Sequence, residues 1–268
     1  DESADSTIHS DTLFSAICSA ARLLYGAESA GEFLRSGNVR LSTAFPFYDN
    51  ELFFPMPLTF RPSFINDLPY PDQKLFKKVK FVCHTYFEKI LNGDELTSAE
   101  LKKEQIIQNC WSAYNRTGNN LFKAYELPRV TIDRVSASSN IFNFSEIHFS
   151  ENAGLFFMAE FANDISKNYF SSALHLLGDE GIGADRTVGK GLFGVEESSV
   201  SINTPESNGK FLLMSLFSPT EEEIDILDIE KSSYELIQRK GWISAPEAAT
   251  LRRKSLRMFA ERSVLTFE

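Results

Sequence analysis

A glycine-rich segment in the second half of the chain, residues 178–194, is the feature that most limits how this sequence can fold. It reads GDEGIGADRTVGKGLFG and holds six glycines, one arginine and one lysine. Backbone with so many glycines can adopt positive φ and approach another group closely, most often a phosphate. The preceding residues, 164–177, have the apolar spacing of an amphipathic helix, and residues 192–202 are predicted to form a strand. The chain is therefore expected to pass from helix to strand through this loop.

This order excludes the common nucleotide-binding loops. A P-loop or a Rossmann turn runs from strand to helix, so that the N–H groups of the helix N-terminus face the phosphate. The spacing also differs from a Walker loop, since five residues rather than four separate Gly183 from the Gly189–Lys190 pair. Gly191 stands where such a loop has the Ser or Thr that binds magnesium. No nucleotide cofactor is expected.

The phosphate chain of a nucleic acid is the ligand that still fits the loop. Positive φ and close backbone approach are expected at Gly181, Gly183, Gly189 and Gly191, and positive charge comes from Arg186 and Lys190. The plainer reading is that these glycines cap the helix or permit tight packing. A cap needs only one glycine, so phosphate binding is the favoured hypothesis.

Apolar periodicity along the chain predicts an α+β fold. In the front half, Ser10 is expected to cap a helix that stops at Gly26, a short helix ends at Gly37, and residues 38–47 and 51–57 read as strands. The second half gives a strand at 129–136, a hairpin of 140–150 with 154–162, the helix and loop described above, and a strand at 210–218. We predict two ferredoxin-like (RRM-like) domains with antiparallel sheets. Their expected bounds are 1–125, with an insertion and without its first strand, and 126–268, which carries the glycine-rich loop and is truncated at its C-terminus.

Charge and cysteine content narrow the class of protein. The net charge of −10 argues against binding nucleic acid through the overall field, although residues 219–235 alone contribute −6 and residues 239–257 contribute +5. Three scattered cysteines fit a reducing cytoplasm, and neither they nor the four histidines have metal-ligand spacing, so no metal is expected. No apolar run approaches the roughly 18 residues that span a bilayer, so no membrane association is expected.

Further candidate RNA-binding residues lie outside the loop. His9 and Ser10 fall at a helix N-terminus, which favours an anion, although Ser10 also suits ordinary capping. Arg134 closes a predicted strand, and a surface ion pair is its alternative role. Arg252 and Lys254 belong to a basic cluster near the second sheet, and such clusters are often only solubilising.

With these pieces in place, the sequence resembles a CRISPR-associated RAMP family, subunit four of the type III-A Csm complex. The resemblance rests on IHSDTLFSAI (8–17), LFFPMP (52–57), VTIDR (130–134), GIGADRTVGKG (181–191) and MFAERSV (258–264). It implies two RRM-like domains, no catalytic activity, and a grip on the 5′ handle of the CRISPR RNA (crRNA). It also implies a position between the large signature (polymerase-palm) subunit and a backbone subunit. Two departures stand out: the family has a strand before HSDTLF, and it usually reads Glu-Gly-Ser where this chain has Glu261–Arg262–Ser263.

Two other functions fit the residues. RAMP relatives include endoribonucleases that cut repeat RNA without a metal, and His9 is the histidine nearest a plausible phosphate site. A scaffold whose glycine-rich loop contacts only a neighbouring protein is the third reading.

Overall fold

The computed structural model describes residues 5–97, 100–135, 138–241 and 254–268. The chain forms two compact units. Unit 1 comprises Phe45–Met56 and Phe60–Phe156 together with the N-terminal segment up to Ile8, and unit 2 comprises His9–Ala44, Pro57–Thr59 and Phe157–Glu268. The units are interleaved along the sequence and do not follow the predicted boundary at residue 125. The fold is mixed α+β with mostly antiparallel sheets, as predicted, while its description as two ferredoxin-like domains stays a prediction.

A six-stranded sheet forms the centre of unit 1, in the order β5-β6-β4-β3-β2-β9. All its pairs are antiparallel except β4 with β6, which run parallel. The strands are β2 (Phe45–Tyr48), β3 (Glu51–Pro55), β4 (Phe81–Cys83), β5 (Ile106–Ile107), β6 (Cys110–Trp111) and β9 (Ala153–Phe156). The helices of this unit are α2 (Tyr70–Phe76) and α3 (His84–Asn92), with 3-10 turns η1 (Ser63–Asp67) and η2 (Lys103–Gln105).

Aromatic side chains fill the core of unit 1. Phe54 is fully buried, stacks on Phe87 with ring centroids 4.8 Å apart, and meets Phe156 edge-on at 5.2 Å. Trp111, also fully buried, lies between Phe76 and Tyr86. This packing accounts for much of the phenylalanine in the sequence, because each such ring removes a large apolar area from water.

A buried ion-pair network fixes one end of the same sheet. The Arg116 guanidinium is 9% exposed and donates to Glu51 (2.9 Å), Asp49 (2.6 Å) and the Ser112 hydroxyl (3.1 Å). The Ser112 hydroxyl in turn donates to Glu51. Because a buried carboxylate without a partner is costly, each member of this network depends on the others.

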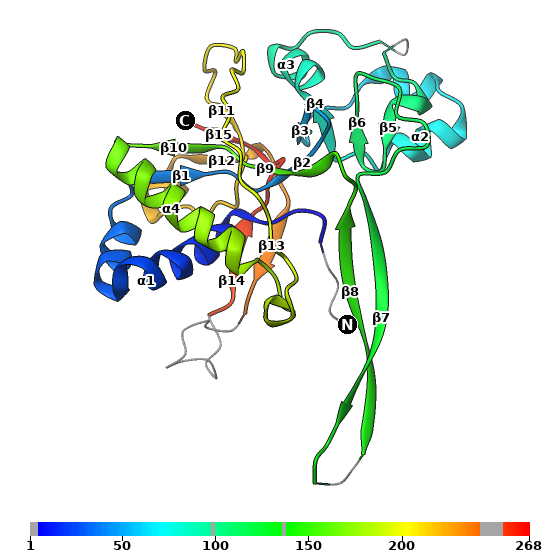
Figure 1. Ribbon diagram of the computed structural model, residues 1–268. Coiled ribbons are helices and arrows are strands. Elements are labelled where there is room, and N and C mark those ends of the chain that lie inside the picture. Colours follow the sequence, from blue (N-terminus) through cyan, green and yellow to red (C-terminus); the bar gives the residue numbers. More distant parts are fainter. Residues whose placement is uncertain (1–4, 98–99, 136–137, 242–253) are drawn as a thin grey trace. The chain divides into compact units, whose positions relative to one another are not determined.

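A long hairpin, β7 (Phe122–Ile132) with β8 (Ser139–Phe149), extends from unit 1 (Figure 1). The predicted hairpin of residues 140–150 with 154–162 is therefore wrong. β8 pairs along its whole length with β7, whereas β9 pairs with β2. Alternation of apolar residues identifies a strand but not its partner, which explains the error.

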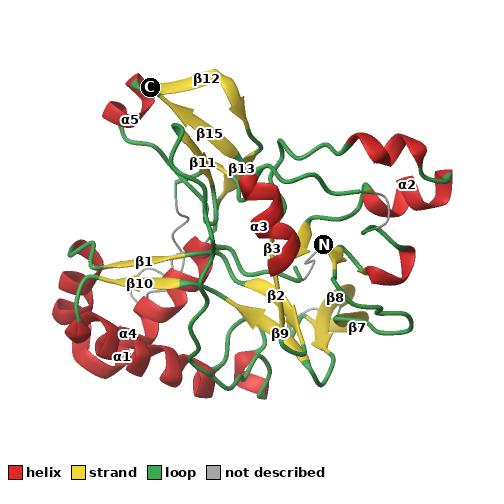
Figure 2. Ribbon diagram, turned by 90° about the horizontal axis from the view of Figure 1, so that it is seen from above, coloured by secondary structure: helices red, strands yellow, loops and turns green. Residues whose placement is uncertain are grey.

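Unit 2 is built on two helices, α1 (Ser10–Arg35) and α4 (Asp164–Glu180), which pack side by side (Figures 1 and 2). Gly26, at φ +84°, interrupts α1 where a helix stop was predicted. Asn163 caps α4 by accepting a hydrogen bond from the Ser166 amide at 2.8 Å. Tyr25 of α1 stacks on Tyr169 of α4 with ring centroids 4.1 Å apart, and Ile17 and Ala21 of α1 are fully buried.

The strands of unit 2 form three small antiparallel sheets, β1-β10, β11-β15-β12 and β13-β14. Their bounds are β1 (Val39–Leu41), β10 (Ala159–Phe161), β11 (Lys210–Leu212), β12 (Leu227–Ser233), β13 (Leu236–Arg239), β14 (Leu256–Phe259) and β15 (Val264–Phe267). The described residues of this unit also form η3 (Arg186–Val188) and α5 (Glu221–Asp225). The strand predicted at 192–202 is absent. Glu197 instead contacts Lys167 (2.9 Å) and Ser171 (3.2 Å), so this extended segment is held against α4 by side chains.

Candidate nucleic-acid interface

The glycine-rich loop follows α4 directly, and its two arms are joined by their own backbone. The Ile182 amide donates to the carbonyl of Gly191 at 2.9 Å, and the Phe193 amide donates to the carbonyl of Gly178 at 3.1 Å. The arms approach so closely that a Cβ on Gly178 would stand 2.5 Å from the Phe193 carbonyl oxygen. A Cβ on Gly181 would stand 2.7 Å from the Lys190 oxygen, and one on Gly191 would collide with the Ile182 oxygen. These three glycines are explained by the loop's own packing.

The glycines at the tip of the loop have a different role. Gly183 (φ +118°) and Gly189 (φ +78°) both have positive φ, yet a Cβ at either position would meet nothing within 4 Å. Between them lies the single turn η3, which contains the exposed Arg186. Lys190 is half-buried, and its Nζ lies 3.6 Å from Asp185. The loop therefore brings together all six of its predicted site residues and leaves open space around the two glycines at its tip.

The predicted N-cap of α1 is corrected by the structure, while the RNA-binding roles of His9 and Ser10 stay predictions. His9 occupies the N-cap position, and Ser10 is the first helical residue, so the predicted Ser10 cap is wrong by one position. Ser10 is buried: its amide donates to the Thr43 hydroxyl at 3.0 Å, and its own hydroxyl accepts from the Leu216 amide at 3.1 Å. Its polar atoms thus join α1 to two other segments of unit 2.

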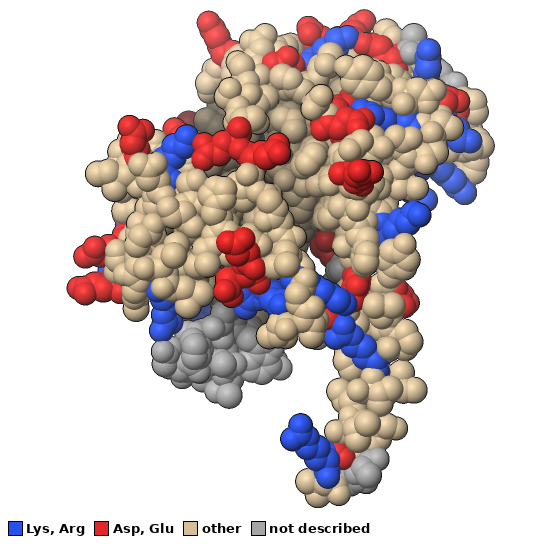
Figure 3. Space-filling model, in the orientation of Figure 1, with Lys and Arg blue, Asp and Glu red and all other residues tan. Residues whose placement is uncertain are grey.

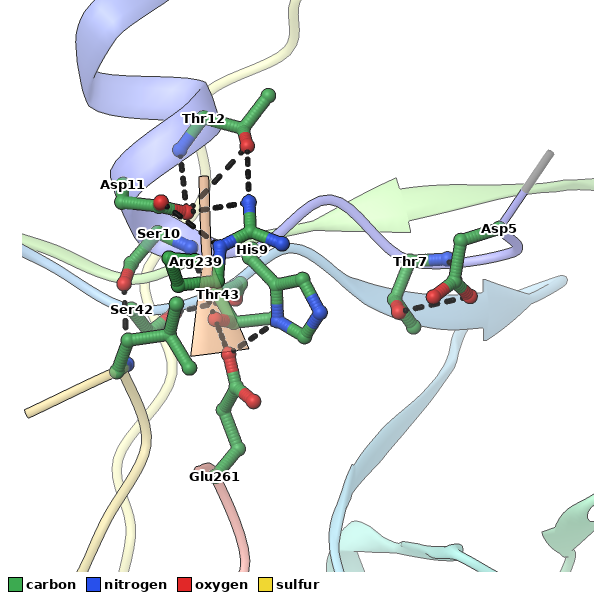
Figure 4. Close-up of polar contacts among 11 residues, drawn as sticks. Asp5, Thr7, His9, Ser10, Asp11, Thr12, Ser42, Thr43, Arg239 and Glu261 are labelled. Atoms are coloured by element: carbon green, nitrogen blue, oxygen red, sulfur yellow. Dashed lines mark hydrogen bonds and ion pairs between the residues drawn. The ribbon is translucent and has the colours of Figure 1, made fainter. Parts of the chain in front are cut away.

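A carboxylate of the chain itself lies beside the α1 N-terminus. Glu261 Oε1 is 2.9 Å from Nδ1 of His9 and accepts a hydrogen bond from the Thr43 hydroxyl (Figure 4). Burial alone would raise the pKa of Glu261, but the hydrogen bonds from His9 and Thr43 lower it below its ordinary value. An internal carboxylate therefore contacts Nδ1 of His9, and the RNA-binding role of His9 stays a prediction.

A second ion pair holds the same helix end. Arg239 donates from Nε and Nη2 to the two carboxylate oxygens of Asp11, each at 2.9 Å, and from Nη2 to the Thr12 hydroxyl at 2.8 Å (Figure 4). Sequence reasoning missed Thr43, Arg239 and Glu261 as members of this cluster. The only signal was that Glu261 lies in a motif shared with the RAMP family, because contacts over more than two hundred residues leave no periodic pattern.

Arg262 stands at the position where the resemblance implies a glycine, and its backbone conformation gives a reason for glycine there. Arg262 has φ +74°, in the left-handed region that glycine adopts without steric cost. Its amide donates to the Leu213 carbonyl at 3.0 Å, and its carbonyl accepts from the Leu58 amide at 2.9 Å. The hydrogen bonds hold the backbone in place, so arginine is tolerated here at a conformational cost.

The remaining predicted residues are not gathered at the loop by any described contact. Arg134 is exposed in the turn of the β7–β8 hairpin, two residues beyond the end of β7, and belongs to unit 1. Lys254 is exposed just before β14 in unit 2. Arg252 lies outside the described residues. The RNA-binding roles of these residues stay predictions.

The residue ranges that the structure describes offer neither a metal site nor a membrane-spanning helix. No group of three or more His, Cys, Asp or Glu side chains in these ranges is placed to hold a metal ion. No described helix is long and apolar enough to cross a membrane.

The three cysteines are buried within their units, and burial raises the pKa of the Cys18 thiol to about 11 and that of Cys83 to about 12.

Comparison with known proteins places these features in a family. Residues 206–268 match the model of the CRISPR Csm4 C-terminal domain. A Csm4 protein of the CRISPR system of Thermococcus onnurineus is 29% identical over 87% of this chain and 74% of its own length. A Csm4 protein of Mycobacterium tuberculosis is 25% identical over 99% of this chain and 82% of its own length.

Solved structures share the fold over nearly the whole chain. A chain from the Csm3–Csm4 subcomplex of a type III-A CRISPR–Cas interference complex superposes with a TM-score of 0.69 at 20% identity, covering 98% of this chain and 88% of that one. A chain from a Csm1–Csm4 cassette in complex with AMPPNP gives a TM-score of 0.64 at 23% identity, covering 98% and 82%.

These findings first define a class: the chain is a CRISPR-associated subunit with a mixed α+β fold. More specifically, the match of residues 206–268 to the Csm4 C-terminal domain, the curated relatives and the shared fold support Csm4 of a type III CRISPR complex as the protein that this chain resembles. The resemblance inferred from the sequence motifs is thereby confirmed at the level of the Csm4 family.

Proposed function

We propose that this chain is the RNA-binding, non-catalytic subunit of a type III-A Csm complex that grips the 5′ handle of the crRNA. In this role it bridges the large signature subunit and a backbone subunit, and it serves antiviral defence in the cytoplasm. The observation that carries the proposal is the geometry of the glycine-rich loop, whose arms are joined while its tip stays open.

The tip suits a phosphate for a physical reason. Gly183 and Gly189 have positive φ without any packing need for it, and turns of this kind can form a concave site for an anion. Because the Gly189 amide already donates to the Arg186 carbonyl at 3.0 Å, the backbone donors of the proposed site are expected on the Gly183 side. Arg186 is exposed beside them and can pair with a phosphate in bidentate fashion. Because the handle is single-stranded RNA of fixed sequence, contacts of this kind would fix its position rather than read its bases.

The bridging role draws on the relatives. Solved structures with the same fold come from a Csm3–Csm4 subcomplex and from Csm1–Csm4 cassettes. We assign this chain the same two kinds of neighbour, with the acidic residues 219–235 outside the RNA contact, since a surface of net charge −6 repels phosphate.

The non-catalytic assignment rests on the surroundings of His9. Its Nδ1 contacts a buried carboxylate, and its ring is only 20% exposed. A general base must reach the substrate proton it removes, and this ring is instead part of a contact that joins α1 to the segment before β15. Metal-independent cleavage of repeat RNA that is lost in His9→Ala would contradict the assignment.

The proposal is tested by retention of the handle in the assembled complex. The complex is purified with the double variant Arg186→Ala/Lys190→Ala, and the bound RNA is extracted, sequenced and quantified. Each lost phosphate contact lowers the affinity for RNA and makes that affinity less dependent on salt, so we expect about tenfold less handle-bearing RNA after a wash at low ionic strength.

The matched control is Lys210→Ala/Lys240→Ala, which removes two exposed lysines of the same unit. Unchanged RNA retention is expected for the control. Equal retention by the loop variant and the natural chain would mean that the loop contacts only protein, and the proposal would fail.

A further inference from the structure

Unit 1 carries a group of lysines that the handle-binding role does not use. Residues 68–80 contain four lysines and a single acid, Asp72, in a chain whose net charge is −10. All four lysines are exposed, and within the described part of the chain none of them forms an ion pair. We call Lys74, Lys77, Lys78 and Lys80 the lysine stripe.

Helical geometry places most of this group on one surface. Tyr70, Lys74, Lys77 and Lys78 stand at positions i, i+4, i+7 and i+8, which share one face of a helix. Although α2 ends at Phe76, the turn continues, because the amides of Lys77 and Val79 donate to the carbonyls of Gln73 (3.0 Å) and Phe76 (2.9 Å).

The opposite side of the same turn anchors it in the core. Phe76 is 3% exposed and Val79 is 2% exposed. Lys80 follows at the entry to β4, where its amide donates to the Asn109 carbonyl at 2.8 Å and its own carbonyl accepts from Met56 at 2.9 Å. The stripe is therefore carried by a fixed backbone, and Figure 3 shows Lys and Arg side chains gathered around the region of α2.

An exposed aromatic ring lies at the start of the stripe. Tyr70 is 67% exposed, and the Lys74 Nζ stands over its ring, 4.7 Å from the centroid. A large exposed ring beside unpaired lysines is the combination that binds single-stranded nucleic acid, because the cations neutralise phosphates while a base stacks on the ring.

We propose that the lysine stripe and Tyr70 form a second contact for single-stranded nucleic acid, separate from the glycine-rich loop. The ligand is a phosphodiester chain held without sequence preference, with one base stacked on Tyr70. The proposal goes beyond the handle-binding role and stands on the residues of unit 1 alone.

The test uses the full chain and a fluorescein-labelled 20-nucleotide oligouridylate, with anisotropy measured across a range of salt concentrations. One variant changes all four lysines of the stripe to Gln. The matched control changes four other exposed lysines to Gln, namely Lys102, Lys103, Lys210 and Lys240. Both variants have the same net charge, so their difference reports the position of the charge and not its amount.

We expect weak, salt-sensitive binding by the natural chain and the control. The stripe variant should bind at least about tenfold more weakly at low salt, and its plot of log affinity against log salt should be shallower by about 2, as for the loss of three phosphate contacts. Tyr70→Ala should weaken binding about tenfold, whereas Tyr70→Phe should bind as the natural chain does. Unchanged thermal unfolding of each variant confirms that the fold is intact.

Equal losses in the stripe variant and the control would overturn the proposal, since total charge would then explain the binding. Normal oligouridylate binding by the stripe variant would also overturn it. If the same variant then failed to retain a protein subunit in the assembled complex, the stripe would be a protein contact and not a nucleic-acid contact. The double variant Arg186→Ala/Lys190→Ala separates the two sites. It is expected to lose the handle in the complex while leaving the salt dependence contributed by the stripe in place.

Discussion

The Ile182 amide donates to the Gly191 carbonyl at 2.9 Å, while the Ile182 oxygen lies where a Cβ of residue 191 would stand. The backbone of Ile182 thus joins the two arms of the loop and also leaves no room for a side chain at position 191. This pair makes the glycine at 191 a requirement of the loop itself, independent of any ligand.

Replacement of Gly191 by Ala should therefore destabilise the protein. Its φ of +76° and the collision with the Ile182 backbone together should cost at least about 2 kcal/mol in the free energy of unfolding. Urea denaturation measures this change. Gly194→Ala is the control, because a Cβ there meets nothing within 4 Å; it should be neutral or stabilise by up to about 1 kcal/mol. Equal effects in the two variants would contradict the packing role.

Removal of the Glu261 charge should weaken unit 2 in a pH-dependent way. The lowered pKa means that the ionised carboxylate adds stability that is fully present above about pH 4.5, its unperturbed value, and is lost as the pH falls through the folded-state pKa. Glu261→Gln should cost about 1.5–3 kcal/mol at pH 7, with a smaller difference from the natural chain below pH 4.5.

Thermal unfolding followed from pH 3 to pH 8 provides the check. Glu160→Gln is the comparison, since its ion pair with Arg40 is exposed on both sides and should change stability by less than about 0.5 kcal/mol. A pH-independent cost in Glu261→Gln would show that shape, and not charge, matters at this position.

At position 262, glycine should be more stable than alanine. Both substitutions remove the arginine side chain, so the difference between them isolates the backbone at φ +74°. A left-handed backbone conformation costs an L-residue about 1–2 kcal/mol. Glycine avoids this cost, but it also raises the conformational entropy of the unfolded chain, which offsets part of the gain. We expect the free energy of unfolding, measured by chemical denaturation, to be about 1 kcal/mol higher for Arg262→Gly than for Arg262→Ala. A more stable alanine variant would refute a conformational reason for the glycine found in relatives.

Loss of Arg116 should be among the most damaging changes to unit 1. Arg116→Met leaves the 7%-exposed carboxylate of Glu51 without its cation and should cost about 3–5 kcal/mol. The double variant Arg116→Met/Glu51→Gln should be less destabilised than the sum of the single variants, because it removes the buried charge as well. Additive costs in this cycle would mean that the two residues act independently.

Local pattern predicted much of the fold. The helix interrupted at Gly26, the helix before the glycine-rich loop and the short strands 45–48 and 51–55 follow from apolar spacing and from glycine and turn positions. Strand pairing did not follow, because alternation in β8 fits β7 and β9 equally well. The segment 192–202 has a strand-like pattern, but in the structure its side chains are held by α4 rather than by a ladder.

In the candidate site too, contacts between residues close in sequence could be predicted, and contacts between distant residues could not. The loop residues, which are close in sequence, lie together as predicted, and the structure separates the glycines that pack from those at the open tip. The cluster around His9 was out of reach, because its partner Glu261 is 252 residues away and nothing in a local window records that distance.

The joined arms of the loop have a consequence for the energetics of binding. Backbone hydrogen bonds between residues 178–182 and 191–193 fix the loop when unit 2 folds. A flexible glycine segment would lose its conformational freedom only on meeting its ligand, and that loss would be subtracted from the affinity. Here that conformational entropy is lost when unit 2 folds, so in the proposed role a phosphate at the tip would meet a loop whose arms are already fixed.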